Sequence, residues 1–181
     1  YFRSPTSFEG FVYLSQLQQA LAIETAVRYW RSLKPRCMGT LYWQLNDVWP
    51  SVSWSSIDHA LAWKALHYHA RRFYAPTAIA ARFEGGRLVI SGIHDGRDAV
   101  ELEVRVRRVG LDGSLLEEAT VEAAIPADLA VEIGRFDAPG TDGFFVIDAR
   151  TAGAGTYDPL MQLTAFPDKP KRYELPPATI A

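Results

Sequence analysis

Apolar side chains recur at steps of three and four residues from Phe8 to Leu33, which is the spacing of one face of a helix. The preceding residues 4–7 supply candidate capping side chains and a proline suited to a first helical turn. Cationic residues lie near the other end, where they suit the helix dipole, and Pro35 cannot continue the helix. The pattern therefore predicts one long helix over residues 8–33.

The segment after this helix changes character twice. Residues 37–45 are mainly apolar or aromatic, as expected of a strand buried on both faces. Residues 46–57 contain a proline, four serines and two tryptophans and predict a loop, after which Asp58 is a suitable N-cap for a second helix to about Tyr74. Such a βα-type unit cannot fold alone, because its strand needs parallel neighbours on both sides.

From Thr77 onward, apolar and polar residues alternate with the period of a strand. The expected strands cover residues 87–91, 100–106, 115–125, 129–133, 143–148 and 160–166. Turns are expected at residues 84–86, 95–96, 111–113 and 139–140, where glycine is present in each. Six or seven short strands over about 90 residues predict an immunoglobulin-like β-sandwich.

Composition supports a division of the chain near residue 76, because all five tryptophans precede it. We expect a first unit over residues 1–76, a sandwich over 77–166, and a proline- and lysine-rich linker over 167–181 toward a further domain. The chain begins Tyr1-Phe2-Arg3 without an initiator methionine, so a piece of a longer protein is expected. Its compartment, cytoplasmic or periplasmic, is left open.

Charge and apolar content exclude several classes of partner. The 181 residues are 48% hydrophobic and 22% charged, which is typical of a globular protein. A net charge of -2 without a lysine or arginine block argues against nucleic acid or an anionic membrane surface as a partner. No apolar run approaches the ~20 residues of a membrane-spanning helix. The single cysteine, Cys37, cannot form an internal disulfide and is expected to be inert.

Residues 39–50, with Trp43-Gln44-Leu45-Asn46-Asp47 at their centre, are similar to the end of the catalytic barrel in β-mannosidase-type glycoside hydrolases of family 2. The same resemblance continues in order through residues 53–58, 63–68 and 70–76, and residues 8–35 resemble the helix before that strand. Residues 163–176 resemble, more weakly, the end of the family's sandwich module. The chain departs from the family at residues 59–62, where the family usually has Tyr, Gly and Arg.

The resemblance implies an α+β fragment: the last strand and flanking helices of a (β/α)8 barrel, followed by an all-β immunoglobulin-like sandwich. It implies a retaining exo-β-mannosidase that removes terminal β-D-mannose from an oligosaccharide or glycoside, with no cofactor and no metal. Both catalytic glutamates of the family would precede Tyr1, so this chain needs the remainder of its own polypeptide and is expected to be inactive alone. Exo-β-D-glucosaminidase, or another family 2 glycosidase such as β-galactosidase, is the alternative activity.

No catalytic residue is expected in this chain, and the candidate substrate-binding residues are Trp43, Asn46, Asp47 and Trp49. By the resemblance, Trp43 lies under the sugar of the -1 subsite, where an indole suits the apolar face of a pyranose, and Trp43-Gln44 is a candidate cis peptide bond. Asn46 and Asp47 either contact sugar hydroxyls and order the loop or serve simple turn chemistry.

Other residues have simpler interpretations. Trp49 and Trp54 fit loop packing as well as subsite walls, and Trp63 is expected in the core. His67 and His69 lie two residues apart on a helix and make a poor metal pair. The charged residues 101, 103, 105 and 107 predict a solvated strand face. For the sandwich, a carbohydrate-binding role would depend on Tyr157 and the Phe144-Phe145 pair, one of which should face inward, and a purely structural role is the alternative.

Overall fold

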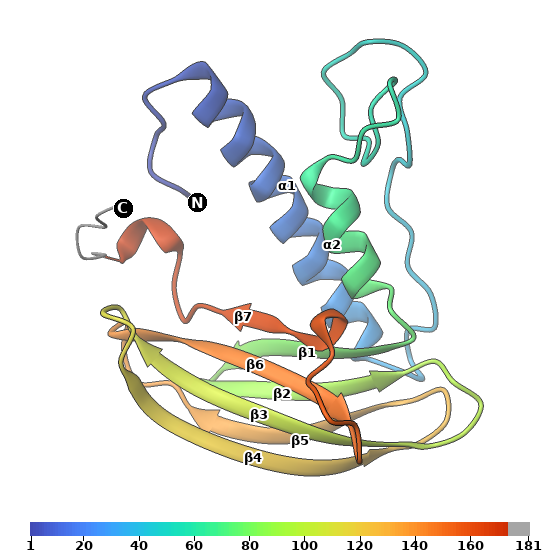
Figure 1. Ribbon diagram of the computed structural model, residues 1–181, viewed down its shortest axis with the longest axis vertical. Coiled ribbons are helices and arrows are strands. Elements are labelled where there is room, and N and C mark those ends of the chain that lie inside the picture. Colours follow the sequence, from blue (N-terminus) through green and yellow to red (C-terminus); the bar gives the residue numbers. More distant parts are fainter. Residues whose placement is uncertain (174–181) are drawn as a thin grey trace.

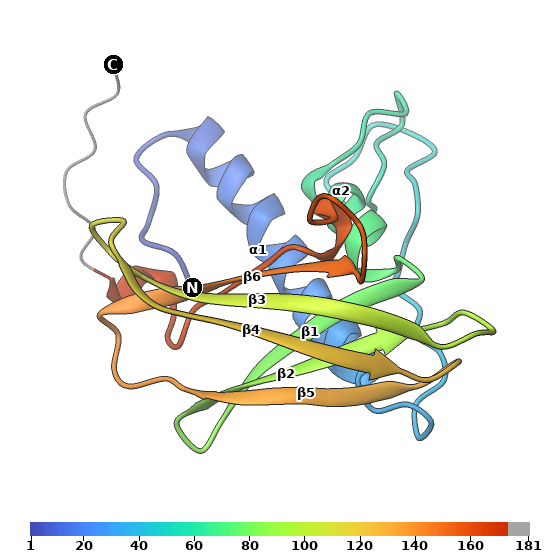
Figure 2. The same cartoon turned by 60° about the horizontal axis from the view of Figure 1, so that its bottom comes forward.

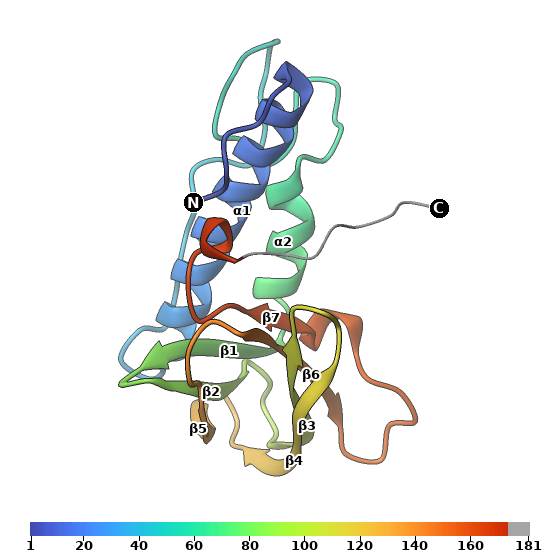
Figure 3. The same ribbon diagram turned by 90° about the vertical axis from the view of Figure 1, so that its left-hand side faces the viewer.

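The computed structural model describes residues 1–173 and consists of a helical hairpin standing on a β-sandwich (Figure 1). Helices α1 (Phe8–Arg31) and α2 (Ala65–Phe73) pack side by side, and α1 also contacts the first strand of the sandwich. Figure 3 shows both helices projecting from the same side of the sandwich. Neither helix of the described residues combines the length and the apolar character that crossing a membrane requires.

Helix α1 confirms the long helix predicted from the apolar period and ends two residues earlier than expected. Ser7 caps it by accepting a hydrogen bond of 3.0 Å from the Gly10 amide, as capping chemistry requires. Its buried face includes Ala20 and Val27, which pack against Leu66 of α2. Helix α1 therefore presents its second half to α2 and the sandwich, whereas large apolar side chains of its first half remain exposed.

The expected β-sandwich is confirmed: residues 1–173 contain seven antiparallel strands in two sheets, which Figure 2 shows facing each other. One sheet has the order β1-β2-β5 and the other the order β4-β3-β6-β7. The strands are β1 (Thr77–Glu84), β2 (Arg87–His94), β3 (Val100–Gly110), β4 (Leu115–Ile125), β5 (Ala130–Asp137), β6 (Gly143–Thr151) and β7 (Leu163–Ala165). Gly85 and Gly86, both with positive φ, make the turn between β1 and β2, as the sequence predicts.

The sandwich core follows from the period of two. Leu102, Val104 and Val106 of β3 are buried, while the charged residues between them point to the other face. They meet side chains from the opposite sheet, such as Ile79 and Leu88, in one continuous apolar cluster. Each fully buried side chain of this size contributes roughly 1.5–3 kcal/mol by leaving water, so the sandwich has its own hydrophobic core.

The predicted strand over residues 160–166 is only partly realised. Asp158 accepts a hydrogen bond from the Leu160 amide and starts a 3-10 turn, η1 (Pro159–Met161), so β7 begins only at Leu163. Residues 167–173 of the predicted linker contain a second such turn, η2 (Pro170–Arg172), whose Lys171 amide donates to the Tyr1 carbonyl at 3.3 Å. Residues 174–181, including the end of the family-like segment, lie outside the described residues.

Two elements predicted between the helices are not found among the described residues. Residues 37–45 form no strand ladder, because a strand buried on both faces has no parallel neighbour among the described residues; nearby there are only isolated bridges that join Ile57 to Asn46 and Trp63. The second helix does not start at Asp58, because its side chain accepts hydrogen bonds from the Ala60 and Ala62 amides and closes a turn. Helix α2 begins only at Ala65.

Candidate functional site

The loop over residues 44–57 is organised around the buried carboxylate of Asp47, which is 7% exposed. Ser53 Oγ donates to one carboxylate oxygen at 2.5 Å, and Ser55 Oγ donates to the other at 2.7 Å. Lys64 Nζ, just before α2, adds a charged donor at 2.9 Å. Hydrogen bonds from Ser53, Ser55 and Lys64 hold the pKa of the Asp47 carboxyl well below its usual range. Asp47 is therefore ionised at physiological pH and fixes the loop rather than delivering a proton.

A second anchor lies where the loop returns to α2. Ser56 Oγ lies 2.8 Å from Tyr42 Oη and 3.1 Å from His67 Nδ1, and it also contacts the Leu45 carbonyl. The Ser56 amide bonds the carbonyls of Gln44 and Leu45. Ser53 and Ser55 both reach the Asp47 carboxylate, whereas Ser56 reaches Tyr42 and His67 instead. One serine-rich run therefore serves both anchors.

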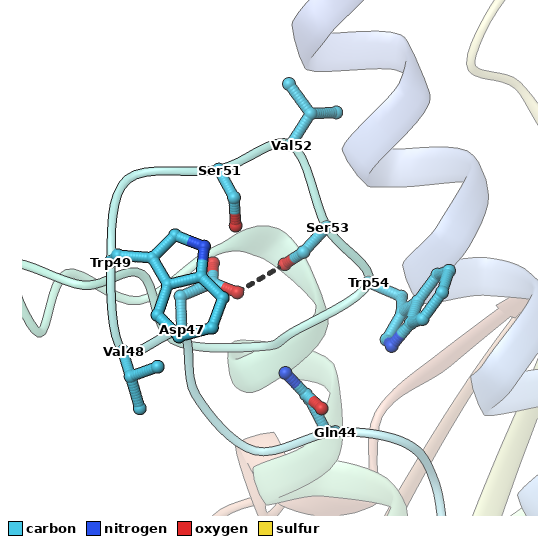
Figure 4. Close-up of a pocket in the computed structure, with 8 residues that line it drawn as sticks. All are labelled: Gln44, Asp47, Val48, Trp49, Ser51, Val52, Ser53 and Trp54. Atoms are coloured by element: carbon cyan, nitrogen blue, oxygen red, sulfur yellow. Dashed lines mark hydrogen bonds between the residues drawn. The ribbon is translucent and has the colours of Figure 1, made fainter.

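The loop encloses a pocket of about 250 Å³ (Figure 4). Its lining residues are Gln44, Asp47, Val48, Trp49, Ser51, Val52, Ser53 and Trp54. In Figure 4, Trp49 is drawn on one side of the pocket and Trp54 on the other side, beside α1. These two indoles are 66% and 61% exposed, so each presents much of its surface to solvent.

The four predicted substrate-binding residues lie in this loop or directly before it. Trp43 is 73% exposed and does not line the pocket, although its neighbour Gln44 does. The Trp43-Gln44 peptide bond is cis, as hypothesised from the resemblance. Asn46 is exposed and donates from Nδ2 to the Asp47 carbonyl at 3.2 Å. The structure thus leaves Trp43, Asn46 and Trp49 accessible and gives Asp47 an internal role; contact of any of them with sugar stays a prediction.

Sequence reasoning missed Lys64 and misplaced Trp63. Lys64 lies 17 positions after Asp47, and no local spacing connects the two, although both belong to the family-like segments. The expectation that Trp63 lies in the core is wrong, because it is 46% exposed and packs edge-on against the rings of His67 and Tyr68. Trp63 therefore packs on the first turn of α2 at the surface and does not lie in the hydrophobic core.

The helical hairpin contains a buried polar cluster that involves the other candidate histidine. His69 Nδ1 lies 2.6 Å from Glu24 Oε2, and Arg28 Nε donates to Glu24 Oε1 at 2.7 Å. Burial alone raises the pKa of Glu24, but the hydrogen bond from His69 and the charge of Arg28 outweigh it and hold the pKa below its usual value. Within residues 1–173, no three potential ligands gather as a metal site would require. Glu24 and its partners border a larger cavity of about 860 Å³ between α1, β1 and β7.

The charged face of β3 is not simply solvated, which corrects the prediction for residues 103, 105 and 107. Arg107 and Arg105 donate to Asp148, which is only 3% exposed, at 2.6 and 3.2 Å. Tyr157 covers this face: its hydroxyl donates to Glu103 at 2.9 Å, and the Arg105 guanidinium lies 4.4 Å from its ring centre. These contacts form an internal network rather than an open surface.

The aromatic residues considered for carbohydrate binding by the sandwich are also engaged. The Tyr157 ring packs against the guanidinium groups of Arg105 and Arg150. Phe145 is 2% exposed in the core, which confirms that one of the phenylalanine pair faces inward, and Phe144 stacks on Phe166. All three rings thus already pack against other side chains of the sandwich, which argues against their use as a platform for sugar stacking.

Comparison with known proteins connects the chain with one enzyme class. No family model matches it. The β-mannosidase of Capra hircus is 40% identical over 95 residues, which are 49% of this chain and 11% of the relative. That of Rattus norvegicus is 33% identical over 134 residues, which are 69% of this chain and 15% of the relative. The chain thus spans about a tenth to a seventh of the curated relatives it matches.

Solved structures agree over more of the chain. The β-D-mannosidase of Dictyoglomus thermophilum superposes with a TM-score of 0.87 over 97% of this chain and 22% of its own, at 27% identity. The exo-chitosanase of Amycolatopsis orientalis superposes with a TM-score of 0.75 over 89% of this chain and 20% of its own, at 18% identity, which shows a shared fold alone. Sequence and structure together confirm the resemblance of this chain to β-mannosidase-type glycoside hydrolases of family 2.

Proposed function

We propose that this chain is the carboxyl-side part of a retaining exo-β-mannosidase. In this proposal residues 1–76 end its (β/α)8 barrel, residues 77–166 are the sandwich that follows, and residues 167–181 lead to a further domain. The observation that carries the proposal is the superposition of 97% of the chain on 22% of a solved β-D-mannosidase, which supports a longer enzyme around a piece of this shape.

The exposed apolar residues between the helices support the barrel assignment. Leu41 is 95% exposed and Met38 is 53% exposed, which is unusual for a short apolar segment. Neighbouring parallel strands from the rest of the polypeptide would cover both faces of residues 37–45 and complete their hydrogen bonds. The segment predicted as a strand would then form one in the longer protein, with the loop over residues 44–57 at the carboxyl end, where such barrels hold their sites.

The acidic residues of the first unit support catalysis by groups outside this chain. Retaining hydrolysis needs two carboxyl groups about 5 Å apart, one as nucleophile and one as acid and base. Residues 1–76 contain only four acidic side chains, Glu9, Glu24, Asp47 and Asp58. Glu24 is held by Arg28 and His69, Asp47 by the loop, and Asp58 closes a turn, so none forms such a pair. The chain alone should therefore not hydrolyse glycosides.

This chain would contribute one wall of the sugar site. The exposed Trp43 indole offers a flat apolar surface to the C–H face of a terminal mannose. Asn46 and Trp49 would contact the substrate from the loop, and Asp47 would act through the loop that it fixes. A rigid wall lowers the cost of holding the sugar in a reactive orientation, because less freedom is lost at the moment of reaction.

Exo-β-D-glucosaminidase stays the second candidate activity. A structure of the Amycolatopsis orientalis exo-chitosanase is a complex with an aryl β-D-glucosamine, and this protein shares the fold of the chain at 18% identity. The curated relatives at 33–40% identity are β-mannosidases instead, which favours mannoside as the substrate. A structural role for the sandwich is favoured over carbohydrate binding, because its candidate rings are engaged internally.

Activity of the longer protein tests the proposal. We expect it to cleave an aryl β-D-mannoside with a kcat/KM at least tenfold above that for the matching aryl β-D-glucosaminide, and this chain alone to cleave neither. A reversed preference would support the glucosaminidase. Cleavage of neither glycoside by the longer protein, or turnover by residues 1–181 alone, would contradict the proposal.

A further inference from the structure

The loop pocket combines two features that suit a sugar ring. Trp49 and Trp54 flank it with indoles that are 66% and 61% exposed, and they stand on different sides of the cavity (Figure 4). Its volume of about 250 Å³ lies just below the ~300–1,000 Å³ of sites for drug-sized ligands. A ligand the size of one monosaccharide unit is therefore the best match to its size.

Polar groups at the pocket select a neutral, hydroxyl-rich ligand. Among the described residues, the Ser51 hydroxyl and the side-chain carbonyl of Gln44 have no hydrogen-bond partner, and Gln44 Nε2 makes only one bond, of 3.3 Å, to the Asn46 carbonyl. The charges are already satisfied, because Lys64 neutralises Asp47 within the loop. An anion would find no free cation here, whereas hydroxyl groups would find both donors and acceptors.

The pocket is preformed rather than assembled by the ligand. The Asp47 carboxylate holds the loop in place by accepting hydrogen bonds from Ser53, Ser55 and Lys64. On the other side, Gln19 Nε2 of α1 donates to the Trp54 carbonyl at 2.7 Å and attaches the end of the loop to the helix. Because the walls are held before binding, little ordering cost would be subtracted from the stacking of a sugar on the indoles.

We propose that this pocket binds the sugar unit on the leaving-group side of the scissile bond, the second pyranose of a β-linked oligosaccharide. This inference rests on the proposed function, in which Trp43 holds the terminal mannose. Gln44 follows Trp43 directly, so the backbone of the pocket begins within about 4 Å of the Trp43 Cα. Two sugars joined by one glycosidic bond need two such neighbouring surfaces.

Two substrates with the same terminal mannose test the inference in the longer protein. β-1,4-Mannobiose places a pyranose on the leaving-group side, whereas β-mannosyl fluoride places a single atom there. We expect Trp54→Ala to lower kcat/KM for mannobiose about tenfold or more, and at least fivefold further than for the fluoride. Trp54→Tyr, which keeps an aromatic face, should recover most of the loss.

Trp30→Ala is the matched control, because it removes an indole that is 43% exposed on α1 and outside the pocket. It should change neither substrate by more than about twofold. Equal losses for both substrates with Trp54→Ala, or no loss for mannobiose, would overturn the inference and leave the proposed function intact. A parent protein that cleaves neither substrate would instead overturn the proposed function, and the inference with it.

Discussion

The buried guanidinium of Arg31 joins the helical hairpin to the sandwich, and its removal should separate the stabilities of the two parts. Arg31 lies in the last turn of α1, and its side chain is 7% exposed. It donates to the carbonyl of Phe73, to that of Ala75 at 3.0 Å, and to Asp95 Oδ2 at 2.7 Å. These acceptors lie at the end of α2, at the junction with β1, and in the turn after β2.

The expected cost of Arg31→Leu follows from those three acceptors. Phe73 and Ala75 are buried, at 0% and 6% exposure, so each carbonyl would lose its donor without gaining water, at about 1–3 kcal/mol each. Asp95 is 39% exposed and keeps Lys34 at 2.5 Å, so its loss adds little. We expect a decrease of about 2–6 kcal/mol in the free energy of unfolding of the helical part.

Two spectroscopic probes can follow the two parts separately during urea unfolding. All five tryptophans precede residue 76, so their fluorescence reports the helical part, whereas the backbone amide NMR signals of β3 report the sandwich. With m-values of about 1–3 kcal/mol/M, the fluorescence midpoint should fall by roughly 1 M or more. The strand signal should hold its midpoint, because the sandwich core is separate.

Arg87→Leu provides the control, because its ion pair with Asp137 joins side chains that are 56% and 80% exposed. Exposed pairs of this kind contribute about 0–1 kcal/mol, so neither midpoint should move by much. Two outcomes would contradict this reasoning. Either Arg31→Leu leaves the fluorescence midpoint within the range of the control, or it shifts both signals together. In either case the Arg31 guanidinium would not stabilise the helical part separately from the sandwich.

Three further changes test the core, an internal network and the loop. Phe145→Ala should lower the stability of the sandwich by about 3–5 kcal/mol in urea unfolding, and a loss under 1 kcal/mol would refute its place in the core. Burial alone raises the pKa of Asp148, but hydrogen bonds from Gln162, Arg107 and Arg105 hold it below the usual value. Its stabilisation is therefore present above the unfolded pKa of about 3.9 and is lost as pH falls further. Asp148→Asn should thus destabilise the chain at pH 7 and reduce its stability loss below pH 4, and an unchanged acid transition would argue against this. Lys64→Met should speed protease cleavage within residues 46–57 severalfold, whereas equal cleavage rates would show that Lys64 does not secure the loop.

Local sequence patterns predicted the elements that depend on local periodicity. The three- and four-residue steps located α1 to within two residues at its end, and the alternation in β3 placed Leu102, Val104 and Val106 inside. Both patterns work because a helix face or a strand face is fixed by neighbours close in sequence. The strand predicted over residues 37–45 failed because a strand needs a partner that its own period does not supply. The helix start at Asp58 failed because the same side chain can close a turn, and the sequence did not distinguish the two roles.

The candidate site was predictable in composition but not in arrangement. Trp43, Asn46 and Trp49 are exposed, so their residue types and the family resemblance identified accessible groups. The ionic contact of Asp47 with Lys64 could not be inferred, because it forms across a loop whose path no periodicity defines. Nor did the sequence distinguish Trp54 from a packing residue, since only the folded loop shows it beside a cavity.

The most direct test of Trp43 as the wall beneath the terminal sugar is kinetic, in the longer protein, with an aryl β-D-mannoside. Loss of a positioning contact can cost about a hundredfold in rate, so Trp43→Ala should lower kcat/KM by about that factor, while Trp43→Phe should lose much less. A Trp43→Ala variant that folds normally and retains kcat/KM within threefold of the parent would show that Trp43 does not hold the terminal sugar.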